Sequence, residues 1–220
     1  MQKPASLDET AEQTMVREQI RARGIHDRRV LAAMEEIPRA EFVPPKDRYR
    51  AHEDRPLPIG GGQTISQPYM VALMTEALSL RGNETVLDVG AGSGYQAAIL
   101  ARLAAHVYAI EREPTLIGAA RATLTRLHLI DRVTLVEGDG SLGYLPAAPY
   151  DAIVVGAGAP DVPPALVEQL AENGRLVIPV GSRALQDLVL IRKSGGVAHR
   201  VGLGGCQFVP LRGEQGWDRK

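Results

Sequence analysis

The apolar and polar positions divide the chain into a short helical part and a longer part in which strands alternate with helices. Apolar residues follow helical spacing from a possible capping box at Ser6–Glu9 to Gly24. The same spacing predicts a second helix over Asp27–Ile37, and the charged, proline-interrupted stretch 39–55 predicts irregular structure. Because these residues include too few apolar side chains to build their own core, we expect residues 1–55 to form a helical N-terminal extension.

An unusual loop and a helix are expected next. The segment Pro56–Pro68 contains three consecutive glycines and a Thr-Ile-Ser sequence. The threonine and serine place hydroxyl groups just before a helix. Pro68 suits the first position of that helix, and Arg81 with Gly82 closes it. Residues 56–83 are therefore interpreted as a loop followed by a helix.

The segment Thr85–Glu111 predicts a buried strand, a glycine-rich turn, a helix and a second strand. Glycine-punctuated, alternating strands are expected between Leu185 and Val209. The elements expected between these two segments are helix 114–128, strands 133–137 and 150–155, helix 164–171 with its stop at Gly174, and strand 175–180.

This alternation predicts an α/β fold with a doubly wound, mostly parallel sheet that ends in antiparallel strands, with ligands at the carboxyl ends of the parallel strands. We expect a single domain over 1–220, with a cofactor-binding α/β core at 84–180 and C-terminal strands at 181–220.

Composition limits the partners, metal sites and cellular compartment that can be expected for this chain. The chain has 220 residues, 45% of them hydrophobic, and a net charge of -1, which gives no reason to expect a nucleic-acid or membrane partner. Cys206 is the single cysteine, so an internal disulfide is excluded. The scattered histidines have no metal-ligand spacing, and we expect no metal site. The polar N-terminus predicts a cytoplasmic protein, and we expect a monomer.

Three glycines at alternate positions, Gly90, Gly92 and Gly94, follow the strand that begins at Thr85. A dinucleotide-binding turn requires a glycine or alanine where this chain has Tyr95. Asp88 precedes the first glycine by two positions, where its charge would repel a pyrophosphate but attract an ammonium group. S-adenosyl-L-methionine has an ammonium group and no phosphate, so the turn favours it over NAD. The alternative is a glycine-rich connection without a ligand.

Two more acids stand where parallel strands are expected to end. Glu111 lies at the position at which a nucleotide-binding unit needs an acid for ribose hydroxyls, although alone it could be a solvated carboxylate. Asp139, between Gly138 and Gly140, could accept a hydrogen bond from an adenine amino group, or form an Asx turn. With Asp88, these acids are expected to converge on one crevice.

Six segments of the chain carry a more specific signal when they are taken together. They are Arg39–Pro44, Pro58–Met70, Leu87–Tyr95, Gly138–Gly140, Ala148–Ile153 and Phe208–Leu211. This combination resembles the protein-L-isoaspartate(D-aspartate) O-methyltransferase family, and the likeness extends from about Met15 to Trp217. Gly158 is a minor departure, because the family often has alanine there.

The resemblance implies a class I S-adenosyl-L-methionine-dependent methyltransferase of Rossmann-like fold. It implies methyl transfer to the α-carboxyl group of L-isoaspartyl residues in damaged proteins and peptides, a repair reaction that leaves S-adenosyl-L-homocysteine. The methyl ester would lead through a succinimide back to aspartate. Ser66 matches the essential serine of the family, and we interpret its hydroxyl as a positioning group because methyl transfer to a carboxylate needs no nucleophilic serine. Thr64 and Ser66 could instead cap the helix that begins at Pro68.

The residues expected to contact the cofactor form one set, while Arg212–Gln215 has no assigned role. The set is Gln63, Thr64, Ile65, Asp88, Gly90, Gly92, Ser93, Gly94, Glu111, Asp139 and Gly140. The alternatives are a class I methyltransferase for another acid, small molecule or RNA, and a catalytically silent cofactor-binding module.

Overall fold

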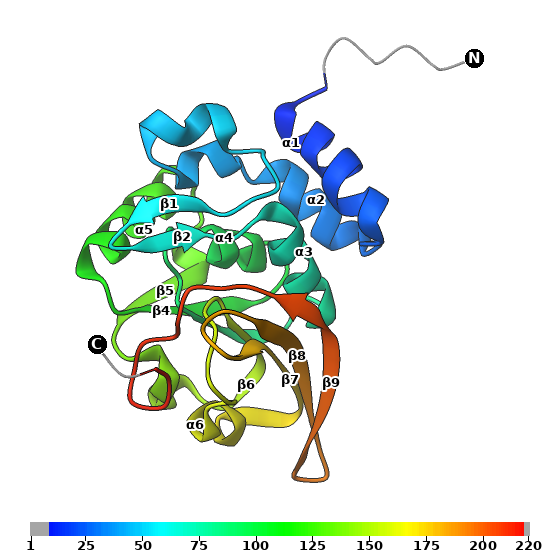
Figure 1. The fold of residues 1–220 in the computed structure, drawn as a ribbon, viewed down its shortest axis with the longest axis vertical. Coiled ribbons are helices and arrows are strands. Elements are labelled where there is room, and N and C mark those ends of the chain that lie inside the picture. Colours follow the sequence, from blue (N-terminus) through cyan, green and yellow to red (C-terminus); the bar gives the residue numbers. More distant parts are fainter. Residues whose placement is uncertain (1–8, 218–220) are drawn as a thin grey trace.

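The computed structural model describes residues 9–217, which fold around one seven-stranded sheet (Figure 1). The strand order is β5-β4-β3-β6-β7-β8-β9, in which β5 to β7 are parallel and the last two strands are antiparallel. The strands are β3 (Thr85–Val89), β4 (His106–Glu111), β5 (Val133–Glu137), β6 (Tyr150–Val155), β7 (Leu170–Gly181), β8 (Gln186–Ser194) and β9 (Val197–Cys206). The predicted doubly wound, mostly parallel sheet with antiparallel C-terminal strands is confirmed.

Alternate residues of the central strands face two hydrophobic cores, one on each side of the sheet. Val86 and Val154 belong to the larger core, and Leu87 and Ile153 belong to the smaller one. The covering helices are α3 (Pro68–Ala77), α4 (Tyr95–Ala101), α5 (Pro114–Arg126) and α6 (Pro164–Glu168). Burial on both faces explains why these strands read as uninterrupted apolar runs.

The N-terminal extension is helical, as predicted. The capping box is formed by Thr10 and Gln13, whereas the one expected at Ser6–Glu9 falls outside the described residues apart from Glu9. The helical elements are α1 (Ala11–Met15), a π-helical turn (Val16–Ile20), a 3-10 turn (Arg21–Arg23), α2 (Arg28–Glu36) and 3-10 helices at Arg39–Phe42 and Pro45–Arg50. The stretch 39–55 is therefore more regular than expected. Met15 and Met34 are buried in the same core as α3 and α4, so the extension has no separate core.

The expected loop at Pro56–Pro68 contains an antiparallel hairpin, so the loop interpretation is wrong for its centre. Strand β1 (Leu57–Gly60) pairs with β2 (Gln63–Ile65). Gly60, Gly61 and Gly62 all have positive φ, which lets the chain reverse within this short stretch. The hairpin lies over the carboxyl edge of the sheet in Figure 1.

The helix expected over 164–171 ends at Glu168, and Gly174 is not its stop but a residue of β7. Gln169, the C-cap residue, is held by other segments, because its buried side chain accepts a hydrogen bond from the Tyr144 N–H and donates one to the Leu142 carbonyl. Its own carbonyl accepts a hydrogen bond from the Tyr150 N–H at 2.9 Å. Strand β7 therefore begins at Leu170, although the helical spacing of apolar residues in the sequence continues to residue 171.

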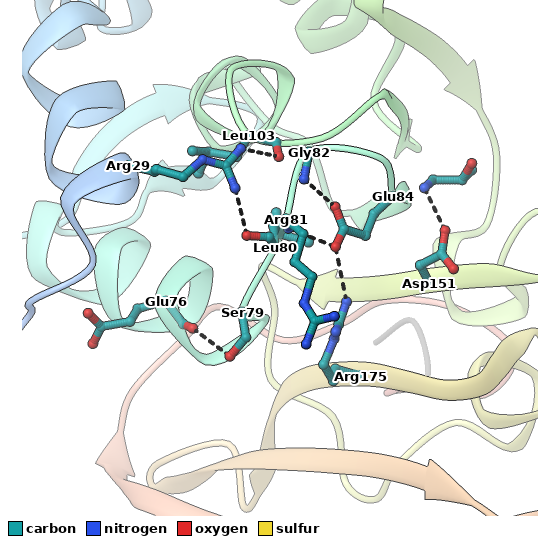
Figure 2. Close-up of polar contacts among 11 residues, drawn as sticks. Arg29, Glu76, Ser79, Leu80, Arg81, Gly82, Glu84, Leu103, Asp151 and Arg175 are labelled. Carbon is teal, nitrogen blue, oxygen red and sulfur yellow. Dashed lines mark hydrogen bonds and ion pairs between the residues drawn. The ribbon is translucent and has the colours of Figure 1, made fainter.

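A network of polar contacts closes the amino edge of the sheet (Figure 2). Glu84 accepts hydrogen bonds from the N–H groups of Arg81 and Gly82, both at 2.8 Å, and lies 3.7 Å from the Arg175 guanidinium. Arg29 of α2 donates to the carbonyls of Leu80 and Leu103. The extension is thereby tied to the edge of the sheet opposite the hairpin.

Candidate functional site

A cleft lies at the carboxyl ends of the parallel strands. Gln63 and Thr64 of the hairpin line one side, and residues 209–212 of the C-terminal segment line another. The floor is made by Gly90, Gly92, Glu111 and Gly140, together with neighbouring backbone. The hairpin and the C-terminal segment, which are far apart in the sequence, thus enclose the strand ends at which the sequence predicts a cofactor.

The turn after β3 keeps its backbone open to this cleft. Gly90 and Gly92 have φ values of 79° and 54°, which side chains other than glycine rarely adopt. A Cβ atom on Gly92 would also approach the Cδ1 of Ile59 in the hairpin to 3.1 Å. The N–H groups of Gly90 and Ala91 are bonded to the Ile110 carbonyl, so the turn is fixed against β4.

Glu111 ends β4 and its carboxylate lies against the turn. One oxygen accepts a hydrogen bond from the Gly92 N–H at 2.9 Å, and the other accepts from the N–H groups of Arg112 and Glu113. These three bonds hold a buried carboxylate in a fixed position at the cleft. Each carboxylate oxygen has more than one lone pair, so the side chain can still accept hydrogen bonds from a ligand.

Asp88 is fully buried, and neither of its carboxylate oxygens has a hydrogen-bond partner within residues 9–217. Burial and the nearby charge of Glu111 raise the pKa of Asp88 to about 7. The side chain lines a second cavity, the Asp88 pocket, which also contains Ile65, Ser66 and Ser93. A buried acid without a protein partner fits the ammonium group of S-adenosyl-L-methionine, because a cation there would satisfy both oxygens.

Asp139 does not reach into the cleft, although its neighbours Gly138 and Gly140 line it. One oxygen accepts hydrogen bonds from the N–H and hydroxyl of Ser141, and the other accepts from the Glu214 N–H at 2.8 Å. Burial raises the pKa of Asp139, but these hydrogen bonds outweigh it and hold the pKa below its usual value. The Asx-turn alternative describes the geometry, and the carboxylate anchors the C-terminal segment.

Gly94 also lies outside the cavities that the other predicted residues line. Its φ of 85° begins α4, and a Cβ atom there would come within 3.1 Å of the Ala120 Cβ. The third glycine of the turn therefore serves the close approach of α5. The contact of Gly94 with the cofactor, which its spacing predicts, stays a prediction.

Ser66 lies between the Asp88 pocket and a third cavity, the Ser66 pocket, whose wall includes Met70 and Phe208. Thr64 and Gly156 line all three cavities, so the cavities meet at these two residues. Gly156 has little room for a side chain, because a Cβ atom would lie 3.2 Å from the Gly90 carbonyl oxygen. Ligands bound in neighbouring cavities could therefore contact each other beside Thr64 and Gly156.

The sequence did not single out Gly156, Arg112 and Arg212, which also line the cleft. Arg112 lines the cleft, and its Nη1 is buried without a hydrogen-bond partner in the described part of the chain. Its position directly after Glu111 was the available signal. The C-terminal wall belongs to a segment with a family resemblance, Phe208–Leu211, but its place at the cleft depends on the hydrogen bond to Asp139 and on the bond from the Gly158 N–H to the Val209 carbonyl.

The described residues bring together no group of three histidine, cysteine, aspartate or glutamate side chains that could hold a metal ion. Cys206 is half-buried at the end of β9, and burial raises the pKa of its thiol to about 11, so the thiol stays protonated at neutral pH. Over 9–217, none of the helices combines the length and the apolar character needed to cross a bilayer.

Comparison with known proteins gives a consistent result. The family model described as protein-L-isoaspartate(D-aspartate) O-methyltransferase (PCMT) matches residues 10–216. A protein-L-isoaspartate O-methyltransferase of Methanoculleus marisnigri is 56% identical over 203 residues, which are 92% of each chain. A relative of the same name from Methanoregula boonei is 53% identical over 93% of this chain and 94% of its own.

A solved structure matches the whole fold. The crystal structure of a putative protein-L-isoaspartate O-methyltransferase from Plasmodium falciparum, in complex with S-adenosyl-L-homocysteine, superposes with a TM-score of 0.82 at 29% identity. The match covers 93% of this chain and 99% of that chain.

Proposed function

Because the chain belongs to the protein-L-isoaspartate(D-aspartate) O-methyltransferase family, it is an S-adenosyl-L-methionine-dependent carboxyl methyltransferase of protein repair, and we propose how its residues divide the work. The α-carboxyl groups of L-isoaspartyl residues in damaged proteins and peptides are its acceptors. We further propose that it acts as a monomer in the cytoplasm; its single cysteine supports a reducing compartment.

The observation that carries the assignment of the cofactor residues is Asp88. A fully buried acid with two unpartnered oxygens needs a cation, and the cleft beside it offers Glu111 for ribose hydroxyls. We assign Gln63, Thr64, Gly90 and Gly92 to the surrounding wall, because all four line the cleft. The donated group is an electrophilic methyl on a sulfonium.

The substrate side of the site is proposed to be the Ser66 pocket. Its apolar wall of Met70 and Phe208 suits a peptide segment, and Ser66 stands between this pocket and the one that holds Asp88. A carboxylate is ionised at neutral pH, so no general base is required. The chain's contribution is then to hold the acceptor with the Ser66 hydroxyl, to align it with the methyl group at Thr64 and Gly156, and to exclude water with the hairpin.

Paired peptides that differ only in an isoaspartyl or an aspartyl linkage test the function. We expect labelled methyl groups to be transferred to the isoaspartyl peptide alone. Equal labelling of both peptides would contradict the specificity, and transfer to neither, with intact binding of S-adenosyl-L-homocysteine, would favour the silent cofactor-binding module.

The Ser66→Ala variant tests the role of the serine. We expect turnover to fall by about 100-fold, because a misplaced acceptor loses alignment, while the Kd for S-adenosyl-L-homocysteine changes less than about threefold. Thr123→Ala is a matched control, because Thr123 is a buried hydroxyl of α5 that lines none of the three cavities. Equal losses of turnover and cofactor affinity in Ser66→Ala would make Ser66 a cofactor residue instead.

A further inference from the structure

Arg39 is buried to an unusual degree for an arginine. It opens the 3-10 helix Arg39–Phe42 of the N-terminal extension, and its side chain has no exposed surface. Charged side chains are almost never fully buried unless they are paired, yet within residues 9–217 no carboxylate lies within ion-pair distance of its guanidinium. Burial lowers the pKa of Arg39 as a consequence. The fold therefore retains a buried charge that needs an explanation.

The partners of this guanidinium belong to the proposed site. Its Nη2 donates to the main-chain carbonyl of Ser66 at 2.8 Å, and its Nε donates to the carbonyl of Ala51 at 2.7 Å. Its central carbon lies 4.9 Å from the centre of the Tyr95 ring. Tyr95 is the first residue of α4 and lines the Asp88 pocket, as Ser66 does. The Arg39 side chain thus contacts both Ser66, which we assign to the acceptor, and α4, the helix that follows the glycine-rich turn.

The geometry also explains why arginine stands at this position. A guanidinium can donate in two directions while its flat face lies on an aromatic ring, whereas a lysine ammonium is a compact point charge without this face. Lysine at position 39 would keep the charge but could not keep all three contacts. An Arg39→Lys substitution therefore keeps the positive charge but removes the positioning of Ser66.

Arg29 provides an internal comparison. This arginine of the extension also donates to two main-chain carbonyls, those of Leu80 and Leu103, at 2.8 and 3.0 Å. Figure 2 shows that these contacts lie at the amino edge of the sheet, near Glu84. Both arginines tie the extension to the core, but only Arg39 does so at the residue that we assign to the acceptor.

We propose that Arg39 is a positioning residue for methyl transfer, which fixes the Ser66 backbone against Tyr95 and so sets where the Ser66 hydroxyl meets the acceptor carboxylate. The proposal rests on the proposed role of Ser66. It assigns the N-terminal extension a part in catalysis beyond covering the core.

Arg39→Lys and Arg29→Lys form a matched pair for the test. Turnover is measured with the isoaspartyl peptide and is divided by the number of sites that bind S-adenosyl-L-homocysteine in calorimetry, so that unfolded protein does not count. For Arg39→Lys we expect kcat per binding site to fall by at least tenfold, with the Kd for S-adenosyl-L-homocysteine within about threefold of wild type. For Arg29→Lys we expect kcat within about twofold of wild type.

Several outcomes would decide against the proposal. A kcat per binding site within twofold of wild type in Arg39→Lys would leave Arg39 as a structural tether only. An equal loss in Arg29→Lys would mean that any loosening of the extension lowers turnover. Wild-type protein that binds S-adenosyl-L-homocysteine but does not methylate the isoaspartyl peptide would instead contradict the proposed function, which keeps the two failures apart.

A measurement on the wild-type protein covers the case in which Arg39→Lys does not fold. Arginine labelled with ¹⁵N gives Nη–H resonances at low temperature, and that of Arg39, whose Nη2 donates to the Ser66 carbonyl, is assigned by its proximity to the Tyr95 ring. Isoaspartyl peptide added with S-adenosyl-L-homocysteine should shift the Arg39 resonance and leave that of Arg29 unchanged. Peptide that saturates the enzyme and shifts neither resonance would overturn the proposal.

Discussion

Strand β3 has a buried acid at each end, and the two acids differ in their partners. Glu84, directly before the strand, accepts two backbone hydrogen bonds and lies beside Arg175. Asp88, near the end of the strand, is equally inaccessible but has no hydrogen-bond partner within residues 9–217. The pKa values respond in opposite directions, because hydrogen bonds and the Arg175 charge outweigh the effect of burial at Glu84, whereas burial dominates at Asp88.

This difference separates an acid that supports the fold from one that is held for a ligand. A buried polar group without a partner costs free energy, and this cost is large for a carboxylate with two unpartnered oxygens unless a ligand satisfies them. The Glu84 carboxylate at the amino edge has its partners within the protein, although the Nε of the neighbouring Arg175 has none in the described residues. At the carboxyl edge, both oxygens of Asp88 lack a partner. Substitutions at either end of β3 test this contrast.

The largest effect is expected from Asp88→Ala. The Kd for S-adenosyl-L-homocysteine, which retains the ammonium group, should rise by about 100-fold, because a charge-assisted contact in a buried site contributes roughly 3 kcal/mol. Isothermal calorimetry measures this Kd directly. The free energy of unfolding of the unliganded protein should not fall at neutral pH, because the substitution removes a group without partners. Unchanged affinity would end the comparison, since Asp88 would then be no ligand for the cofactor.

Glu84→Gln should have the opposite profile. The amide keeps one acceptor oxygen but presents an NH₂ group to one of the two N–H donors, Arg81 or Gly82, and loses the charge beside Arg175. We expect the free energy of unfolding to fall by about 2 kcal/mol in urea titrations. The Kd for S-adenosyl-L-homocysteine and kcat should stay within about twofold of wild type. A larger loss of cofactor affinity would mean that the two ends of β3 are coupled.

These two acids also show what the sequence can reveal. The unit Thr85–Glu111 was predicted because its strands, turn and helix depend on local apolar runs and glycine spacing, and Asp88 was singled out by its distance from Gly90. Glu84 gave no signal, because its partner Arg175 lies far away in the sequence. Asp139 was placed correctly at a strand end, but its direction depends on Glu214, which sequence spacing cannot indicate.

The hairpin and Arg39 were missed for related reasons. Three successive glycines predict a flexible loop, and only the pairing of Leu57 with Ile65 makes the segment a hairpin. Arg39 stands in a charged stretch, where arginine is expected to be solvated. Its burial follows from the packing of the extension against α3 and α4, a tertiary contact that no local pattern encodes.

The pH dependence of ligand binding should show a smaller effect. Because the pKa of Asp88 is raised from 3.8 to about 7, its contribution to stability is fully present below pH 3.8 and is lost as the pH rises to about 7. An ammonium ligand needs the carboxylate, so binding must release this proton at pH 6. We expect the Kd for S-adenosyl-L-homocysteine to rise by about fivefold from pH 7 to pH 6, while Asp88→Asn loses this dependence. Calorimetry in buffers of different ionisation enthalpy measures the proton release.

The smallest effect is expected from Asp151→Asn at the amino edge. Asp151 accepts a hydrogen bond from the Thr85 N–H at 2.8 Å, and this contact appears in Figure 2. Asparagine offers the same kind of acceptor oxygen without charge, so the free energy of unfolding should fall by only about 0.5 kcal/mol, whereas Asp151→Ala should cost about 1 kcal/mol or more because the N–H loses its partner. Urea titrations of both variants measure the difference. Equal losses of unfolding free energy in the two variants would show that the charge of Asp151, rather than its hydrogen bond, stabilises this edge of the sheet.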